Sequence, residues 1–301
     1  MRVSNRMISE TFINNVMKSL ERLNDSQNRV LTGRKVDQLS DSPVDIKSIQ
    51  RLNAELTDNQ VYLDNIQNGI GWINSSSAAL SQLNDLLTEA KNLTVEAANA
   101  TRSATDRQRI AQQLNGILEQ VLSLGNKTYL DSYIFAGTRV DEQPFVAQRD
   151  VTGKITSVDA SGDLSGKIWR KIAKTERIQI NANIEEIFTG DEGVFNVLID
   201  LRNALHNNDV ATIQESLSNL TTLQDKVIAK EAEQGALMNQ LEQMQNYLEN
   251  EKLQNEKTLS DIQDMDITEA IARFQQEQVA YQFGLAVGNQ MLRLSLLNYL
   301  K

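Results

Sequence analysis

Residues 49–80, IQRLNAELTDNQVYLDNIQNGIGWINSSSAAL, carry the clearest helical pattern of the chain. The apolar residues of this stretch recur at alternating steps of about three and four, which places them on one face of an α-helix. They are Ile49, Leu52, Leu56, Leu63, Ile66, Ile70, Ile73 and Leu80, with Asn59 and Ser77 as polar interruptions. Because a helix this long cannot cover its apolar face by itself, the stretch predicts a bundle or a coiled coil.

The same spacing continues on both sides of this stretch. Toward the N-terminus it includes Ile13, Val16, Leu20, Leu23 and Val30. Gly33 can end that helix, and Pro43 suits the first turn of the next, with Ser42 or Asp41 as its cap. After a polar break at residues 101–106 the spacing resumes with Ile110, Leu114, Ile117, Val121 and Leu124. We therefore expect antiparallel helices joined by a short loop.

The middle of the chain has a different texture. Residues 125–193 hold 7 of the 14 glycines, and helical periodicity stops there. Short runs of β-branched or aromatic residues lie at 145–146, 154–156, 167–169 and 177–180, between turn residues. This pattern is typical of strands and predicts a small β-rich insert.

Helical spacing returns in the last third. It includes Val194, Leu198, Leu201, Leu205, Ile213, Leu217, Leu220, Val227, Met238, Leu241 and Leu248. The final segment carries Ile267, Ile271, Phe274, Tyr281, Leu285 and Leu292 at heptad spacing, with Gln278 and Gly288 as interruptions. Beyond Tyr281 the helix is apolar on nearly every side, so its surface requires a partner.

Together these patterns predict a mainly α fold. Both chain ends form a long antiparallel helical hairpin or coiled-coil bundle, and a small β-rich insert lies in the middle. We expect three parts: a terminal coiled-coil domain of residues 1–44 with 257–301, a helical bundle of 45–139 with 187–256, and an insert of 140–186. The terminal part is expected to be disordered before assembly, because its apolar seam has few neighbours in a free chain.

Composition excludes several classes of function. The formal net charge is -10, from 40 acidic and 30 basic residues, and no Lys/Arg cluster stands out, so nucleic acid is a poor partner. No apolar run is long enough for a membrane span, so we expect no membrane insertion. Residues 1–15 lack the apolar core of a secretory signal, which leaves export without a cleaved signal open.

Nothing in the sequence favours an enzyme. Cysteine is absent and His206 is the single histidine, which removes thiol chemistry and multi-histidine metal centres. Residues 162–167, GDLSGK, have the wrong spacing for a phosphate loop. Asp264, Asp266 and Glu269 lack the central glycine of a calcium loop and are better explained as a helix cap or solvated positions. We expect no catalytic residue, no cofactor and no metal.

Motifs near the two ends resemble the flagellin family. Residues 31–36, LTGRKV, and 40–43, SDSP, are similar to its N-terminal pattern of a helix, a Gly-basic turn and a step into the next helix. Residues 260–266, SDIQDMD, and 295–300, SLLNYL, are similar to its C-terminal signatures. The resemblance covers roughly residues 1–140 and 190–301. Within the family, residues 125–138 and 143–145 are similar to the segment that leads into the insert of hook-filament junction proteins.

The resemblance implies a structural subunit of the bacterial flagellum, located outside the cell. Its subunits would self-assemble into a ring between an adjacent hook-associated protein and the flagellin filament. Export would use the flagellar type III apparatus without a cleaved signal, and a cytoplasmic chaperone would hold the C-terminal helix. The chain ends would form an inner coiled coil, with the insert facing outward.

Three groups of residues carry these expectations. The subunit-assembly seam comprises Ile13, Val16, Leu20, Leu23, Ile271, Phe274, Tyr281, Leu285 and Leu292. The residues for export-chaperone binding are Leu285, Met291, Leu292, Leu294 and Leu297. The family turn motif is Gly33, Asp41 and Pro43.

Two other functions fit the same patterns. A small flagellin, the filament subunit, would share both ends but would polymerise into long filaments. A soluble coiled-coil adaptor would need only the charged, Gln-rich stretch 240–257 and would dimerise in dilute solution. An enzyme would need a site in the insert or at its border, and no residue there indicates one.

Overall fold

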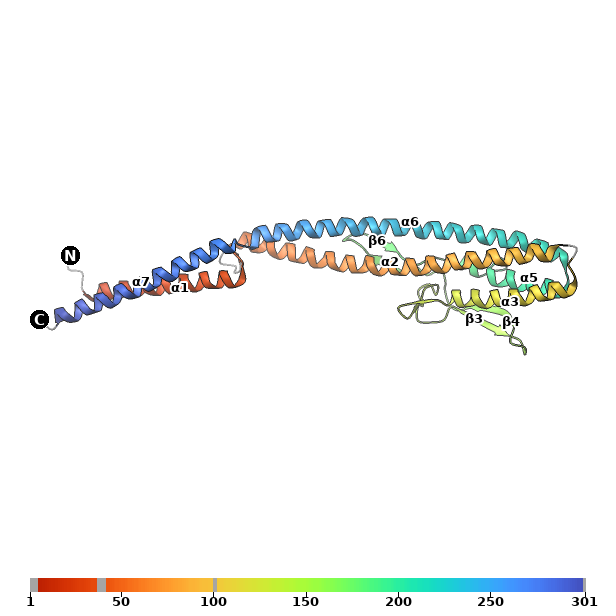
Figure 1. Cartoon of the computed structure of the whole chain (residues 1–301), viewed down its shortest axis with the longest axis horizontal. Helices are drawn as coiled ribbons and strands as arrows, with labels where there is room; N and C mark the ends of the chain where they lie inside the picture. Colours follow the sequence, from red (N-terminus) through yellow and green to blue (C-terminus); the bar gives the residue numbers. More distant parts are fainter. Residues whose placement is uncertain (1–4, 37–41, 100–101, 300–301) are drawn as a thin grey trace. The chain divides into compact units, whose positions relative to one another are not determined.

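The computed structural model describes residues 5–36, 42–99 and 102–299, with the backbone alone for residues 5, 6, 8, 9 and 291–299. The described chain is mainly helical with small β hairpins in its middle, which confirms the predicted fold class (Figure 1). It divides into two compact units, a smaller one of residues 1–58 with 251–301 and a larger one of residues 59–250.

Seven helices and six strands make up the described chain. The helices are α1 (Asn5–Thr32), α2 (Pro43–Ala98), α3 (Ala104–Gly125), α4 (Glu185–Phe188), α5 (Val194–Asn207), α6 (Val210–Gln263) and α7 (Ile267–Tyr299). The strands are β1 (Thr128–Tyr129), β2 (Ser132–Tyr133), β3 (Phe145–Arg149), β4 (Ile155–Ala160), β5 (Trp169–Lys171) and β6 (Arg177–Gln179). The long helices α2 and α6 each contribute residues to both units.

In the larger unit, α2 and α6 run antiparallel, side by side (Figure 1). The Ser76 hydroxyl lies 3.1 Å from Gln234 Oε1, and Gln224 Nε2 donates to Thr88 Oγ1 at 2.8 Å. As residue numbers rise along α2, the numbers of their partners in α6 fall. The antiparallel pairing expected from the two apolar stripes is therefore present.

The buried face of α2 follows the heptad rhythm more closely than its apolar residues do. Besides Trp72 and Ala79, the buried residues from 59 to 97 are Asn59, Tyr62, Ile66, Gly69, Ile73, Ser76, Leu80, Leu83, Leu87, Ala90, Thr94 and Ala97. Asn59, an interruption in the sequence pattern, is thus part of the buried face. Polar and small residues therefore occupy the buried heptad positions at which α2 has no large apolar residue.

Leu63 and Ile70 of the predicted stripe, and its interruption Ser77, lie at the edge of the buried face, where Leu63 and Ile70 pack against the core. These three are only partly buried, and the residue before each one is buried instead. The cause is a second layer of contacts, because the hairpin region also covers α2. A Cβ added at Gly69 would lie 3.1 Å from Ile180 and 3.3 Å from Leu241 of α6, so two neighbours meet α2 there.

The middle of the described chain contains three separate two-stranded antiparallel hairpins, β1–β2, β3–β4 and β5–β6, and the last two lie within residues 140–186. The strands expected around residues 145, 155, 169 and 178 are confirmed. The hairpin β1–β2 lies before residue 140, and its two-residue strands are too short to leave a periodic signal in the sequence. Hairpin β3–β4 is the longest and has an irregular register between Gln148 and Arg149.

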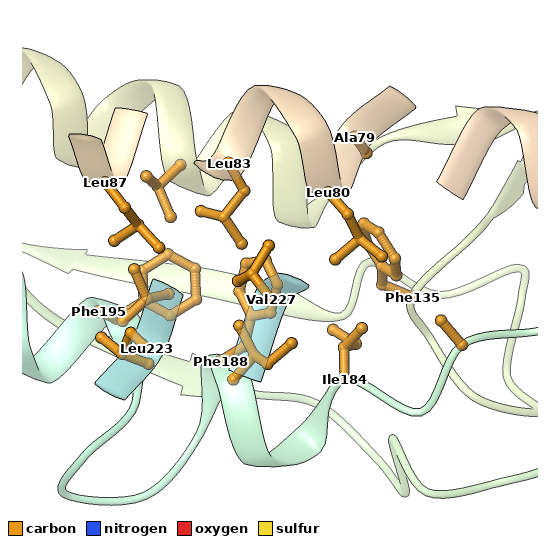
Figure 2. Packing of buried hydrophobic residues seen from close by; sticks show 14 of the residues in the cluster. Ala79, Leu80, Leu83, Leu87, Phe135, Ile184, Phe188, Phe195, Leu223 and Val227 are labelled. Carbon is orange, nitrogen blue, oxygen red and sulfur yellow. The ribbon is translucent and has the colours of Figure 1, made fainter. Parts of the chain in front are cut away.

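One hydrophobic core joins the hairpins to the helices of the larger unit. Figure 2 shows Leu80, Leu83 and Leu87 of α2 facing Leu223 and Val227 of α6, with phenylalanines between them. The ring centroids of Phe188 lie 5.0 Å from Phe145 and 5.5 Å from Phe195. Aromatic contacts of this kind add to the burial energy and hold β3, α4 and α5 on the long helices.

Candidate functional site

The smaller unit is built on an antiparallel pair of the terminal helices α1 and α7. Arg22 Nε lies 3.2 Å from Glu277 Oε2, and a Cβ added at Gly284 would lie 3.8 Å from Val16. Near the other end of α1, a Cβ added at Gly33 would lie 3.6 Å from Ile267. The two terminal helices therefore contact each other along most of their length.

Small residues of α7 let α1 approach closely. Gly288 is buried, and the ring of Phe12 occupies the space that a Cβ at that position would need. Gly288 interrupts the heptad in the sequence, but in the structure it is the position that accepts an aromatic side chain. The predicted seam did not include Phe12. Because Phe12 lies four residues before Val16, about one turn of the helix, this spacing could have identified it.

The predicted seam residues fall into two groups. Five are partly buried at or beside the pair: Val16, Leu20, Leu23, Phe274 and Tyr281. Ile13, Ile271 and Leu285 are exposed, with fractional exposures of 54%, 42% and 47%. Leu292 lies in α7, but its side chain is outside the described part of the structure. Contact between α1 and α7 therefore uses only part of the predicted seam.

A second apolar face lies on the far side of α7. Val279, Phe283 and Val287 are all exposed, and Phe283 retains 70% of its accessible surface. At about 100° per residue, Phe283 lies roughly opposite Tyr281, which faces α1. On α1, Met17 is exposed beside Ile13 in the same way. Apolar surface on two sides of a helix pair is typical of an element that packs against further chains.

The family turn motif lies in the connection between α1 and α2, and this connection is hydrogen-bonded to the one between α6 and α7. Gly33 has a φ of +69°, a left-handed conformation that favours glycine. Its carbonyl accepts a hydrogen bond from Met265 N at 3.0 Å, and Lys35 N donates to Gln263 O at 2.7 Å. Pro43 is the first residue of α2, as predicted, while Asp41 lies outside the described residues. The loop after α1 is thus bonded to the α6–α7 connection.

Asp266 caps the start of α7. Asp266 Oδ1 accepts hydrogen bonds from Thr268 N at 2.7 Å and Glu269 N at 3.3 Å. These backbone hydrogen bonds hold the pKa of the Asp266 carboxyl below its ordinary value. The interpretation as a helix cap is confirmed for Asp266, while Asp264 and Glu269 are exposed. Within the described residues, no group of three or more His, Cys, Asp or Glu side chains could hold a metal ion.

The residues expected to bind a chaperone lie in the last part of α7. Leu285 is half-exposed, and its neighbours Phe283 and Val287 are exposed as well. Met291, Leu292, Leu294 and Leu297 continue the same helix, but their side chains lie outside the described part of the structure. None of the helices in the described ranges has an apolar stretch of the length that crossing a membrane requires.

Comparison with known families gives two matches that flank the insert. Residues 3–139 match the bacterial flagellin N-terminal helical region, and residues 208–300 match the bacterial flagellin C-terminal helical region. Together they cover both helix pairs and leave most of the hairpin region unmatched. A search of curated protein sequences found no significant match.

Solved structures with the same fold include three flagellar proteins. A protein described as a flagellar hook-associated protein of Vibrio parahaemolyticus is 22% identical, with a TM-score of 0.66, and the match covers 74% of this chain and 100% of that one. Bacillus cereus FlgL is 21% identical, with a TM-score of 0.57 and coverage of 71% and 100%. Flagellar hook-associated protein 3 of Legionella pneumophila is 13% identical, with a TM-score of 0.62 and coverage of 71% and 98%. The matched regions at both ends show that this chain belongs to the bacterial flagellin family.

Proposed function

We propose that this chain is a structural subunit of the junction between the flagellar hook and the filament, and not an enzyme. The observation that carries this proposal is the apolar surface left on the α1–α7 pair, in a chain of the flagellin family. The similarity in fold to hook-associated proteins supports the junction in preference to the filament.

Assembly would use both apolar sides of the terminal pair. Residues that lie between α1 and α7, such as Val16 and Tyr281, hold the pair together within one subunit. Exposed residues, such as Ile13, Ile271 and Leu285, then contact neighbouring subunits. Since burial of one such side chain contributes roughly 1.5–3 kcal/mol, several of them suffice to drive association into a ring. The ring would lie between an adjacent hook-associated protein and flagellin.

The same surface would need protection before assembly. A cytoplasmic chaperone would cover the apolar end of α7, at Leu285, Met291, Leu292, Leu294 and Leu297. The ends would be disordered in the free subunit and would order on assembly, because only neighbouring subunits bury enough apolar surface to offset the entropy cost. Export would follow the flagellar type III route without a cleaved signal and deliver the subunit outside the cell.

The three parts would divide these tasks. Residues 1–44 with 257–301 form the inner assembly domain, residues 45–139 with 187–256 form the helical bundle, and residues 140–186 form an outward insert. An insert of short hairpins contributes little to assembly through the terminal helices.

Immunogold labelling of intact flagella tests the proposal directly. Antibody raised against residues 59–250 should give a single band between hook and filament. Labelling along the whole filament would instead identify the chain as a flagellin. The absence of label from flagella would favour a soluble coiled-coil adaptor. A strain that lacks the gene serves as the control for antibody specificity.

A further inference from the structure

A polar pocket of about 500 Å³ lies between α3, α5 and the hairpin β3–β4, within the larger unit. Four amide side chains line it: Gln108, Gln112, Asn115 and Asn203. The pocket is distinct from the terminal helix pair, and the proposed assembly gives it no role. Its volume is in the range of sites that bind small molecules.

A buried arginine forms one wall of this pocket. Arg202 is 8% exposed, and its Nη1 donates to Ile155 O at 2.6 Å and to Asn115 Oδ1 at 3.1 Å. Its Nη2 donates to Asn203 Oδ1 at 3.2 Å. All of these acceptors are uncharged, whereas a buried guanidinium normally faces a carboxylate. Over the described residues, the structure gives Arg202 hydrogen bonds but no ion pair.

The charges around Arg202 leave the pocket positive. Lys154, on the hairpin, adds a second cation, and Asp150 is the one carboxylate among the pocket's lining residues. Asp150 is already engaged in the hairpin turn, where its Oδ1 accepts hydrogen bonds from Thr152 N at 2.8 Å and Lys154 N at 3.0 Å. Arg202, Lys154 and Asp150 together carry a net charge of +1, which one further negative charge would balance.

Burial of Arg202 shows that its charge is poorly solvated. Desolvation lowers the pKa of the Arg202 guanidinium, while the nearby charge of Asp150 acts in the opposite direction. On the hairpin β3–β4, Arg149 forms a two-pronged ion pair with Glu119 of α3, at 2.5 and 2.8 Å. That pair fixes the hairpin against α3 and keeps Lys154 at the pocket.

We propose that this pocket binds a carboxylate group, with Arg202 and Lys154 as its cationic partners. A carboxylate supplies the single missing charge, whereas a phosphate would bring more than one. One hydrogen on Nη2 of Arg202 remains for the ligand, because the other N–H groups already donate to Asn115, Ile155 and Asn203. The four amides can bond to hydroxyl or amide groups on the body of the ligand. The carboxylate could come from a free organic acid or from an Asp or Glu side chain of another polypeptide.

Calorimetry with the full chain tests this site. The probes are gluconate, sorbitol as its uncharged counterpart, inorganic phosphate and a tetraglutamate peptide, all at one ionic strength. Binding of gluconate but not sorbitol supports a free acid as the ligand. Binding of tetraglutamate alone supports a polypeptide side chain as the source. The proposal is overturned if neither gluconate nor tetraglutamate binds, or if phosphate binds more tightly than both of them.

Two lysine variants assign the binding to this pocket. Lys154→Gln should weaken binding of the carboxylate probe about tenfold, which is the effect of losing one charge-assisted hydrogen bond. Thermal unfolding should not change, because Lys154 is exposed. Lys167→Gln, an exposed lysine outside the pocket, should bind as the wild type does. Equal affinity of the wild type and Lys154→Gln would rule the pocket out. Failure of the free-acid and peptide probes would leave the immunogold result for the junction unaffected.

Discussion

The ring of Phe12 in α1 rests directly on the backbone of α7 at Gly288. No side chain larger than hydrogen fits at position 288 unless the ring moves. A side chain at position 288 would hold the Phe12 ring, and with it this part of α1, farther from α7. The contact therefore sets the spacing of the terminal pair.

Gly288→Ala should weaken the terminal pair and reduce the fraction of hooks that carry filaments. The added methyl group takes the place of the Phe12 ring, and this clash outweighs the better helix propensity of alanine. Electron microscopy of isolated flagella gives the count. The double variant Phe12→Ala with Gly288→Ala should recover part of the loss, because the smaller side chain removes the clash.

The matched control is Gly235→Ala in α6, where an added Cβ meets no atom within 4 Å. That change should stabilise the chain by about 0.5–1 kcal/mol through helix propensity alone. If both glycine variants supported filaments equally well, the close contact at Gly288 would have no role in assembly.

Phe283→Asp should abolish assembly and leave the larger unit unchanged. Phe283 is exposed on the side of α7 away from α1, so a charge there is harmless to the free chain but costly in an apolar interface. The measurements are filament attachment in cells and thermal unfolding of the purified chain. Normal filaments in this variant would show that the second apolar face contacts no neighbour.

Gln234→Leu should raise the stability of the α2–α6 pair by about 1 kcal/mol. Gln234 is fully buried, and its Nε2 has no hydrogen-bond partner among the described residues. Ser76 would keep its bond to Ile73 O, at 3.0 Å, when the amide is removed. Urea unfolding monitored by circular dichroism measures the change. Gln214→Leu, at an exposed position of the same helix, should have almost no effect.

Arg107→Ala should destabilise the larger unit by about 2–4 kcal/mol. Arg107 is buried, and its Nε and Nη2 donate to Ala97 O at 2.9 Å and Asn99 O at 3.2 Å, which satisfies carbonyls at the end of α2. Its Nη1 also bonds Asn208, between α5 and α6. Arg109→Ala, which removes only an exposed ion pair with Asp106, should unfold close to the wild type.

Glu231→Gln should stabilise the chain at neutral pH but not in acid. Burial, and then the charge of Asp85, raise the pKa of Glu231 above its ordinary value of 4.5. Between pH 4.5 and the pKa of the folded state, Glu231 keeps its proton in the folded chain and loses it in the unfolded chain. The free energy of unfolding therefore falls as pH rises through this range. Unfolding free energies measured across this range should converge below pH 4.5. Asp85→Asn should reproduce a smaller part of the gain.

Heptad spacing in the sequence was enough to predict the long helices and their antiparallel pairing, while the short β-branched and aromatic runs placed the hairpins β3–β4 and β5–β6. These features depend on patterns that repeat over a few residues, and the buried face of α2 shows the same heptad spacing in the structure. The buried face of α2 could not be placed to the residue. A stripe read from large apolar side chains misses buried positions such as Asn59, Gly69 and Ser76, whose burial depends on neighbours from distant parts of the chain.

The helical architecture, the meeting of the two chain ends and the lack of catalytic motifs could be predicted before the fold was known, because helix periodicity and residue chemistry can be read along the chain. Which side of each terminal helix is covered depends on packing and could not be predicted in this way. Phe12 enters the gap at Gly288, which leaves Ile13, Leu285 and Phe283 exposed. The pocket at Arg202 also required the fold, since its cations come from a hairpin and a helix 48 residues apart in the sequence, Lys154 and Arg202. No local pattern encodes such a separation, because long-range packing alone brings the two side chains together.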